Sequence, residues 1–422
     1  MPYLTRQPTW LVALTLTLGG AAAPSLAQEG DAAMAGSEIT FEGSALADQT
    51  PAIVTAAEAF LATLSDEQQD AAQFDWNDDT QRHNWSNFPL GGPGVNRQGV
   101  KWGDLDAEQR AALVNLLGTL LSSDGLKMVQ EQMAADDIVA ANDDGGGPPG
   151  APPDEGQATD GEAPPAGTEP DQASAVDQAQ ANDQGNAQTA DASQSDAGAP
   201  PQGERPPVSF GSAYYFVSFV GEPSETEPFM IQFGGHHLAI NATVAGPHVT
   251  LSPTLTGGQP LRFVLNGRPV YIVEEEAVQA AQLLASFDET QRQGAVVSDE
   301  RADLVLGPGH DGEVLQPEGI AGADMDVQQR AQFLELIEGR LGILNADDLA
   351  AVMAPIAENL DQTTFAWFGP TEPLGAAYWR VVGPTVILEF APQSNDGDPT
   401  DHAHNIYRDP TNEYGAAWAA VP

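Results

Sequence analysis

Four of the seven histidines of this chain fall in two short motifs, and these motifs are its strongest candidates for chemistry. His236 and His237 are adjacent within residues 232–244, which read as a strand with alternating side chains. In a strand, His236 would share a face with apolar residues and His237 a face with polar ones. His237 is therefore predicted to be the more accessible ring and His236 the more buried, unless the two preceding glycines bend the chain.

His402 and His404 form the second motif. Because they are two residues apart, an extended chain points both imidazoles to one side, which is a common way to bind a divalent transition metal. We expect these rings to converge with His236 or His237 on a divalent metal ion. Glu389 is predicted to act there as a fourth ligand or as a general base.

The histidine spacing also permits a second interpretation, because neither pair has the fixed helical geometry of an HExxH motif. In this interpretation, His236 is a core histidine whose ring is hydrogen-bonded to the backbone. His402 and His404 then belong to a solvent-exposed loop in an aspartate-rich terminus.

A third segment, residues 81–89, mixes arginine, histidine, asparagine and tryptophan in a chain that has only 15 basic residues. Arg82 or Arg408 is predicted to act in catalysis as a clamp for an anionic substrate. Three further residues are predicted to bind the ligand: Trp85, Arg97 and Tyr407. The alternative is a structural loop in which the arginines neutralise buried carboxylates and the tryptophan fills the core.

The composition limits the class of protein. A hydrophobic content of 41% is enough for a packed core. The absence of cysteine excludes a disulfide scaffold and any cysteine-ligated zinc or iron–sulfur site. A formal net charge of −46 argues against nucleic-acid binding, because a polyanion would meet a surface of its own sign. The partner is therefore predicted to be a small-molecule or polymeric ligand of unknown identity.

Residues 1–27 are predicted to be a cleavable signal peptide, with a sparse positive region, a short apolar run at 10–20 and a small-residue cleavage site. The run is too short to span about 30 Å of hydrocarbon, so we expect no membrane span and a periplasmic or secreted protein. Residues 28–50 are predicted to be a flexible tether. Residues 143–207, rich in proline, glycine and aspartate, are predicted to be a disordered acidic insert.

The remaining chain is predicted to contain an internal duplication. Each pair of similar segments has matching helix caps or matching strand patterns: 58–68 with 278–291, 105–111 with 325–331, and 229–241 with 377–389. The interval between copies is longer for the helices because the insert lies between helices and strands in the first copy only. We therefore predict an α+β fold with two related halves, 51–142 with 208–271 and 272–422, packed as one globular unit.

Several long motifs are shared with one family. They are residues 82–89, 104–110, 214–216 with 221–224, 232–238 and 404–415. Through these motifs the chain resembles the exported bacterial proteins that carry the domain of unknown function DUF3500. The resemblance extends over nearly all of the predicted mature chain except the insert. Because the activity of that family is unassigned, the resemblance implies no catalytic residue.

The sequence thus predicts an exported protein that holds a divalent metal ion in a histidine-containing cleft and supports hydrolysis or an oxidative step there. The alternative is a non-enzymatic module that binds a small anionic or polymeric ligand in the cell envelope. A third class is a structural envelope protein. Converging histidines and carboxylates would favour the enzyme, whereas an aromatic groove with scattered histidines would favour the binding module.

Overall fold

The computed structural model describes residues 49–92, 94–142, 208–393 and 398–419. The predicted signal peptide, the predicted insert and nearly all of the predicted tether lie outside these residues. Thr50, the last residue of the predicted tether, is the first residue of a helix. Among the helices of the described residues, none is long and apolar enough to cross a membrane.

Most strands of the described residues form one sheet. In chain order its strands are β1 (Gln73–Phe74), β2 (Val100–Lys101), β3 (Phe216–Val220), β4 (Phe229–Gly235), β5 (Leu238–Ala245), β6 (His248–Thr250), β7 (Thr254–Gly258), β10 (Val296–Ser298), β11 (Ile320–Ala321), β12 (Thr364–Phe368), β13 (Tyr378–Val382), β14 (Ile387–Pro392) and β15 (Ala403–Arg408). They follow the order β1-β3-β4-β5-β7-β15-β14-β13-β12-β10, with β2 on β3, β6 on β5 and β11 on β12. Neighbouring strands are antiparallel except β1 with β3 and β10 with β12. A separate hairpin pairs β8 (Arg262–Leu265) with β9 (Arg268–Tyr271).

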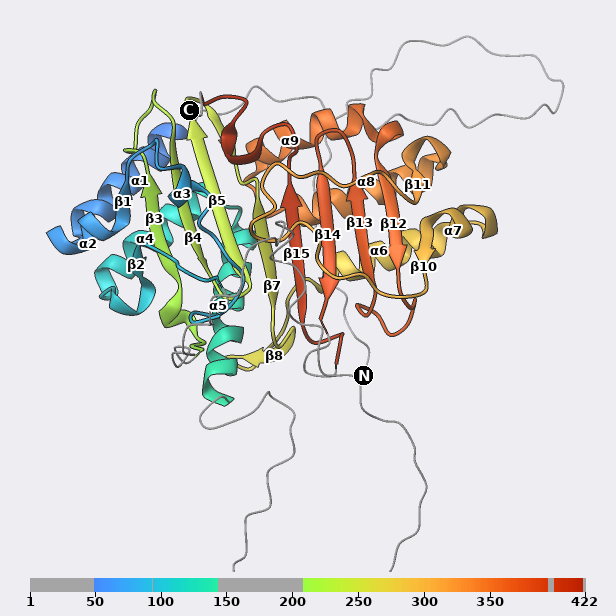
Figure 1. Ribbon diagram of the computed structural model, residues 1–422, viewed down its shortest axis with the longest axis horizontal. Helices are drawn as coiled ribbons and strands as arrows, with labels where there is room; N and C mark the ends of the chain where they lie inside the picture. Colours follow the sequence, from blue (N-terminus) through green and yellow to red (C-terminus); the bar gives the residue numbers. More distant parts are fainter. Residues whose placement is uncertain (1–48, 93, 143–207, 394–397, 420–422) are drawn as a thin grey trace, which may run out of the picture. The chain divides into compact units, whose positions relative to one another are not determined.

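Helices cover one face of the sheet, and long loops cross the other face (Figure 1). The α-helices are α1 (Thr50–Thr63), α2 (Asp66–Ala72), α3 (Asp79–Arg82), α4 (Ala107–Leu120), α5 (Ser123–Asn142), α6 (Glu274–Ser286), α7 (Glu289–Ala295), α8 (Val327–Leu341) and α9 (Ala346–Glu358). Short 3-10 helices are η1 (Trp102–Asp104), η2 (Ser212–Tyr214), η3 (Gly322–Asp324), η4 (Leu360–Gln362) and η5 (Glu413–Gly415). Helices together with a mixed sheet confirm the predicted α+β class.

Each face of the sheet has its own apolar core. The larger core joins the helices to the sheet and includes Phe60, Leu113, Phe333 and Trp379. The smaller core lies under the loops and gathers around Trp85, with Met230 and Ile406 from the strands among its members. Burying a side chain of this size contributes about 1.5–3 kcal/mol, so the helix-side core supplies most of the hydrophobic stabilisation.

Four helices begin with a capping box. In it, the side chain of the N-cap residue accepts from the backbone N–H three residues later, and the side chain of that later residue accepts from the N-cap backbone N–H. The boxes are Ser65 with Gln68, Asp106 with Gln109, Asp288 with Gln291, and Asp326 with Gln329. Two of these glutamines also donate to the last turn of an earlier helix, Gln109 to the Thr63 carbonyl and Gln329 to the Ser286 carbonyl. Each cap is worth about 1 kcal/mol, and the cross-links fix the helix pairs α1–α4 and α6–α8.

Close backbone contacts at glycine also recur at matching places. A Cβ atom on Gly99 would collide with the Val217 carbonyl, and one on Gly319 would collide with the Phe365 carbonyl. Both glycines have φ in the left-handed region, 116° and 88°. Two duplicated halves would be expected to share such contacts. The internal duplication itself stays a prediction.

One pair of strands joins the two sides of the sheet. β7 and β15 are antiparallel neighbours, and their register places Gly257 opposite His404. Arg340 from α8 is buried beneath this pair and donates from Nη2 to the carbonyls of Thr254 and Asn405, one on each strand. Residues 402–404 therefore lie at the start of a strand in the middle of the strand order, and not in an exposed loop.

Replacing Gly235 by alanine is expected to destabilise the protein. A Cβ atom on Gly235 would collide with the ring of Tyr215, which is fully buried in the helix-side core. Overpacking of this kind costs about 1–3 kcal/mol, which urea denaturation would measure as a fall in the free energy of unfolding. The control is Gly294→Ala in α7, where a Cβ atom meets nothing within 4 Å. Better helix propensity should raise its stability by up to about 1 kcal/mol, and equal losses in both variants would contradict the prediction.

Candidate metal centre

His236 and His237 are the two residues of the turn between β4 and β5, so the predicted strand alternation does not extend to them. Both side chains are buried, which corrects the expectation that His237 is the more accessible of the two. His237 has a φ of 61°, in the left-handed region that non-glycine residues seldom adopt. Its backbone N–H donates to the Asn87 carbonyl at 3.0 Å, which helps to hold this conformation.

His237 meets the second histidine motif. His402 lies directly before β15 and His404 within it, two residues apart on one side, as the spacing predicted. The Nε2 atoms of His237 and His402 are 2.8 Å apart. One ring nitrogen from each of His237, His402 and His404 falls in a group whose members all lie within 4.8 Å of one another. The two motifs, far apart in the sequence, therefore converge on one point.

The three rings are held in a nearly dry environment. His237 is 3% exposed and His402 8% exposed, while His404 is half-buried. Burial lowers the pKa of His402 to about 3 and holds the pKa values of His237 and His404 well below the ordinary range, with repulsion among the histidines as the second cause. All three imidazoles are therefore neutral at pH 7, the protonation state in which a ring nitrogen can bind a metal ion.

Two polar atoms at the cluster have no hydrogen-bond partner. One is the Nδ1 atom of buried His402 and the other is the Oδ1 atom of Asn87. The Asn87 amide nitrogen lies 3.2 Å from the Nε2 atom of His404, so this side chain touches the cluster. Buried polar atoms are rarely left unpaired, and those that are need a physical explanation such as a bound ion or water. Asn87 belongs to the segment 81–89, but its amide carried no separate signal in the sequence.

His236, the other histidine of the first motif and also a predicted metal ligand, lies beside the cluster but is paired elsewhere. Its ring packs on the His237 ring with centroids 3.7 Å apart. Its Nδ1 atom lies 2.7 Å from a carboxylate oxygen of Asp136 in α5, and its carbonyl accepts a hydrogen bond from the Tyr215 hydroxyl. His236 is thus a supporting ring next to the cluster. Asp136 was missed in the sequence because nothing distinguishes it from the many other acidic residues of this chain.

Glu389 does not join the histidines. Its carboxylate is fully buried and accepts hydrogen bonds from the backbone N–H groups of Val305 and Leu306 and from the Tyr378 hydroxyl. Burial raises the pKa of Glu389, although these three donors favour the charged form. The carboxylate fastens the loop that follows β10 to the sheet. The predicted role as ligand or general base therefore does not fit, since the acceptor oxygens are already used.

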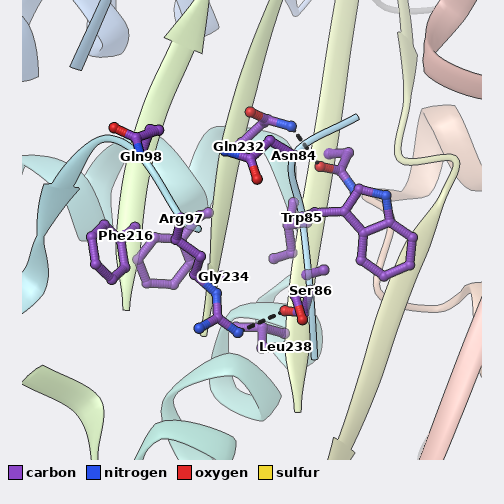
Figure 2. A pocket seen from close by; sticks show the side chains of 13 residues that line it. Asn84, Trp85, Ser86, Arg97, Gln98, Phe216, Gln232, Gly234 and Leu238 are labelled. Carbon is purple, nitrogen blue, oxygen red and sulfur yellow. Dashed lines mark hydrogen bonds between the residues drawn. The ribbon is translucent and has the colours of Figure 1, made fainter. Parts of the chain in front are cut away.

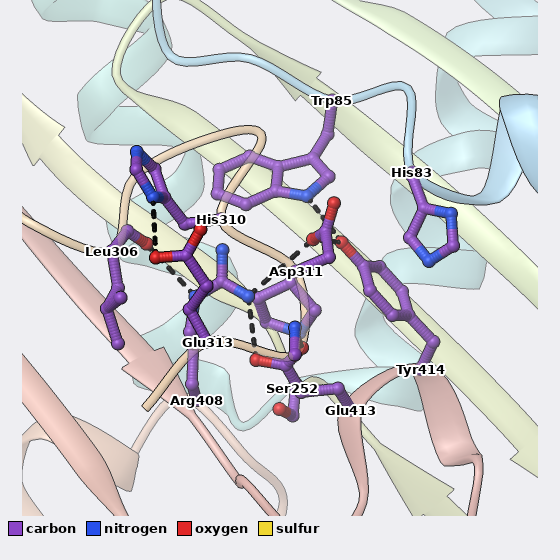
Figure 3. Close-up of polar contacts among 12 residues, drawn as sticks. His83, Trp85, Ser252, Leu306, His310, Asp311, Glu313, Arg408, Glu413 and Tyr414 are labelled. Atoms are coloured by element: carbon purple, nitrogen blue, oxygen red, sulfur yellow. Dashed lines mark hydrogen bonds and ion pairs between the residues drawn. The ribbon is translucent and has the colours of Figure 1, made fainter. Parts of the chain in front are cut away.

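Arg408 is likewise engaged by the fold (Figure 3). Its guanidinium is fully buried and donates to the carbonyls of Leu306 and Gly307 and to the Glu413 carboxylate. Asp311 lies 3.6 Å from the same guanidinium. The predicted clamp for an anionic substrate does not fit Arg408, because its charge is already neutralised by these protein carboxylates.

Arg82 lies inside the loop-side layer, away from solvent. Its guanidinium stacks 4.1 Å from the centre of the Trp76 ring and donates to the Trp76 carbonyl. Two of its nitrogens, Nε and Nη1, are buried without a hydrogen-bond partner. This arrangement agrees with the alternative interpretation of the segment as a structural loop.

Trp85 and Arg97 line a small pocket between the loop and the sheet (Figure 2). Arg97 donates from Nη2 to the carbonyls of Ser86 and Gly235, and burial lowers its pKa to about 10. The pocket has a volume of about 30 Å³, only a few times the roughly 10–15 Å³ that one water molecule needs, so it is too small for an organic ligand. Trp85 donates from its indole N–H to the Tyr414 hydroxyl at 2.8 Å.

Tyr407, the third residue predicted to bind a ligand, is only 1% exposed and packs in the helix-side core. Burial raises the pKa of its hydroxyl, which has no hydrogen-bond partner. Tyr407 thus faces the helices and lies in neither the histidine cluster nor the pocket beside Trp85. Of the predicted metal ligands, the structure brings together His237, His402 and His404, with His236 at their side.

Glu389→Gln is expected to lower the free energy of unfolding by about 1–3 kcal/mol. The amide replaces one acceptor oxygen with a donor, so one of the three donors that now reach Glu389 loses its partner. Urea denaturation would measure the loss. The control is Glu300→Gln, which removes an exposed carboxylate and should change stability by less than about 0.5 kcal/mol. An undiminished stability of Glu389→Gln would contradict a structural role.

The metal-free protein is expected to lose stability as the pH falls below about 6.5. Since the pKa of His402 is about 3 when folded and 6.5 ordinarily, the unfolded chain binds more protons between these values. The stabilisation is fully present above pH 6.5 and is lost as the pH falls toward 3. For His402 the loss between pH 7 and pH 5 is about 2 kcal/mol. Urea denaturation at both pH values in a chelator should show a smaller loss for His402→Gln, and equal losses would contradict the prediction.

Comparison with known proteins identifies the family of the chain. A family model described as "Protein of unknown function (DUF3500)" matches residues 47–416. We found no match to the chain among curated proteins or among solved structures. The matched range contains every described helix and strand and all three histidines of the cluster. The resemblance drawn from the sequence motifs is confirmed, and the chain belongs to the DUF3500 family.

Proposed function

We propose that this protein binds one divalent transition-metal ion through His237, His402 and His404. The observation that carries the proposal is the convergence of three imidazole nitrogens, from two distant motifs, within 4.8 Å of one another. Ligands at about 2.0–2.1 Å from a tetrahedral metal lie about 3.3 Å apart. The distance of 2.8 Å between two of the nitrogens is close to that value, so small rotations of the rings would complete the geometry.

The donor set favours a particular class of metal. The group contains three imidazoles and no carboxylate. Imidazole suits zinc, copper, iron and nickel, whereas magnesium and calcium prefer oxygen ligands. Because the rings are neutral at pH 7, a metal ion need not displace protons to bind. The unpaired Asn87 oxygen is a polar atom that a water bound to such an ion could satisfy.

Three protein ligands leave a coordination position for water or substrate, which is the arrangement typical of catalytic and not of structural zinc sites. A metal ion there would supply Lewis acidity and an activated water. We therefore propose hydrolysis as the first reaction class and an oxidative step as the second. Glu389, Arg82 and Arg408 are engaged in folding contacts, so the protein's own contribution at this site is to hold three neutral rings and to exclude bulk water.

The location of the protein is part of the same proposal. The sequence pattern of residues 1–27 supports export to the periplasm or the medium. An exported protein would meet its metal ion and its substrate outside the cytoplasm.

Metal content tests the proposal. The protein, purified without a polyhistidine tag and dialysed against zinc, copper, nickel or iron(II), should contain about one ion per chain by mass spectrometry. His237→Asn should weaken binding by more than about 100-fold, because it removes one of three ligands. Asparagine tolerates the left-handed conformation, so the turn should keep its shape.

The control variant is His310→Gln, which removes a histidine that pairs with Glu313 outside the cluster. It should bind metal as the parent protein does, and circular dichroism should be unchanged in both variants. The proposal fails if the parent protein binds none of the four metals, or if His237→Asn retains its metal.

A further inference from the structure

A second cavity lies at the other end of the sheet from the histidines. It has a volume of about 250 Å³ and is lined by β6, by one side of α9 and by the segment that follows β15. Figure 1 shows α9 and the C-terminal segment at the same end of the sheet. The cavity is just below the size of pockets that hold drug-sized ligands, about 300 Å³ and above, so its ligand would be small.

Two carboxyl groups face this cavity, Asp348 from α9 and Asp409 from the end of β15. Burial raises the pKa of Asp348 to about 6 and also raises the pKa of Asp409, since each carboxylate has lost part of its hydration. Among the described residues that line the cavity, none is a lysine or an arginine. Two partly dehydrated carboxyl groups in a cavity that no lysine or arginine lines are complementary to a cation.

The rest of the lining is apolar and aromatic. Val249, Val352 and Pro355 form its apolar wall. The rings of His248 and Trp418 are stacked with centroids 5.0 Å apart and an angle of 24°. Trp418 is 40% exposed, so its indole is accessible at the mouth. An indole face attracts cations, and apolar walls favour the carbon atoms of an organic ion over a bare hydrated ion.

Thr385 also lines the cavity, and its hydroxyl oxygen is buried without a hydrogen-bond partner. In the part of the chain that the structure describes, the histidine cluster is the one group of three or more His, Asp or Glu residues with metal-ligand spacing. Asp348 and Asp409 do not belong to such a group.

We propose that this cavity binds a small organic cation, an alkylammonium ion. The charged nitrogen lies between Asp348, Asp409 and the indole of Trp418. The carbon atoms pack against the apolar wall formed by α9 and β6. This site is separate from the metal centre, so each can be tested without the other.

The test compares choline with 3,3-dimethylbutan-1-ol, its neutral analogue of the same shape. Isothermal titration of the whole protein is carried out at 150 mM salt, which weakens general attraction of cations to an acidic protein. Choline should bind at least about tenfold more tightly than the alcohol, because only the cation pairs with the carboxylates. Equal affinity for the two probes overturns the proposal, as does failure of both choline and butylammonium to bind.

Two variants locate the site. Asp409→Asn should weaken choline binding by about tenfold, and Trp418→Ala should weaken it by a similar factor. The control is Asp70→Asn, which removes one exposed carboxylate in α2 and should change the affinity less than twofold. Equal weakening in Asp409→Asn and Asp70→Asn would mean that choline senses only the net charge, and this result would also overturn the proposal.

Discussion

The pairing of β7 with β15 is the constraint on which the rest of the structure depends. These strands join the part of the sheet that begins at β1 to the part that ends at β10. Arg340 fastens the pair from the helix side, because it donates to a carbonyl on each strand. The same register sets His404 opposite Gly257, where a Cβ atom would collide with the Ala403 carbonyl. One strand pair thus holds the sheet together and positions two of the three histidines, His404 within β15 and His402 directly before it.

On the loop-covered face, several polar and charged residues stabilise the fold by hydrogen bonds. A buried charge or amide costs several kcal/mol unless it is hydrogen-bonded. The segments that cross this face supply the missing partners: Gln81 of α3 donates to the Gln232 side chain, and two loop carbonyls accept from Arg408. Glu389 in turn accepts from two loop N–H groups. The hydrogen-bonding groups of these residues therefore hold the covering segments against the sheet.

The histidine cluster carries costs that the rest of the fold must offset. A non-glycine residue in the left-handed region costs about 1–3 kcal/mol, and His237 adopts that region. Neutral buried rings add a dependence of stability on pH, because the unfolded chain binds protons that the folded chain excludes. Under the proposed function, a ligand that binds only the folded state would return part of this stability. Strain and dehydration are often concentrated at functional sites for this reason.

The sequence by itself determined the family, the α+β class, the capped helices with their apolar faces, and the two histidine motifs. Local patterns were sufficient for these, since capping and helical spacing act over a few residues. The tertiary structure decided which polar side chains are already hydrogen-bonded within the protein. The local sequence around Arg408 and Glu389 does not show whether they bind a ligand or hold a loop, because their partners near residue 306 are distant in the chain. Contacts over such intervals depend on strand order and register, which a local pattern does not contain.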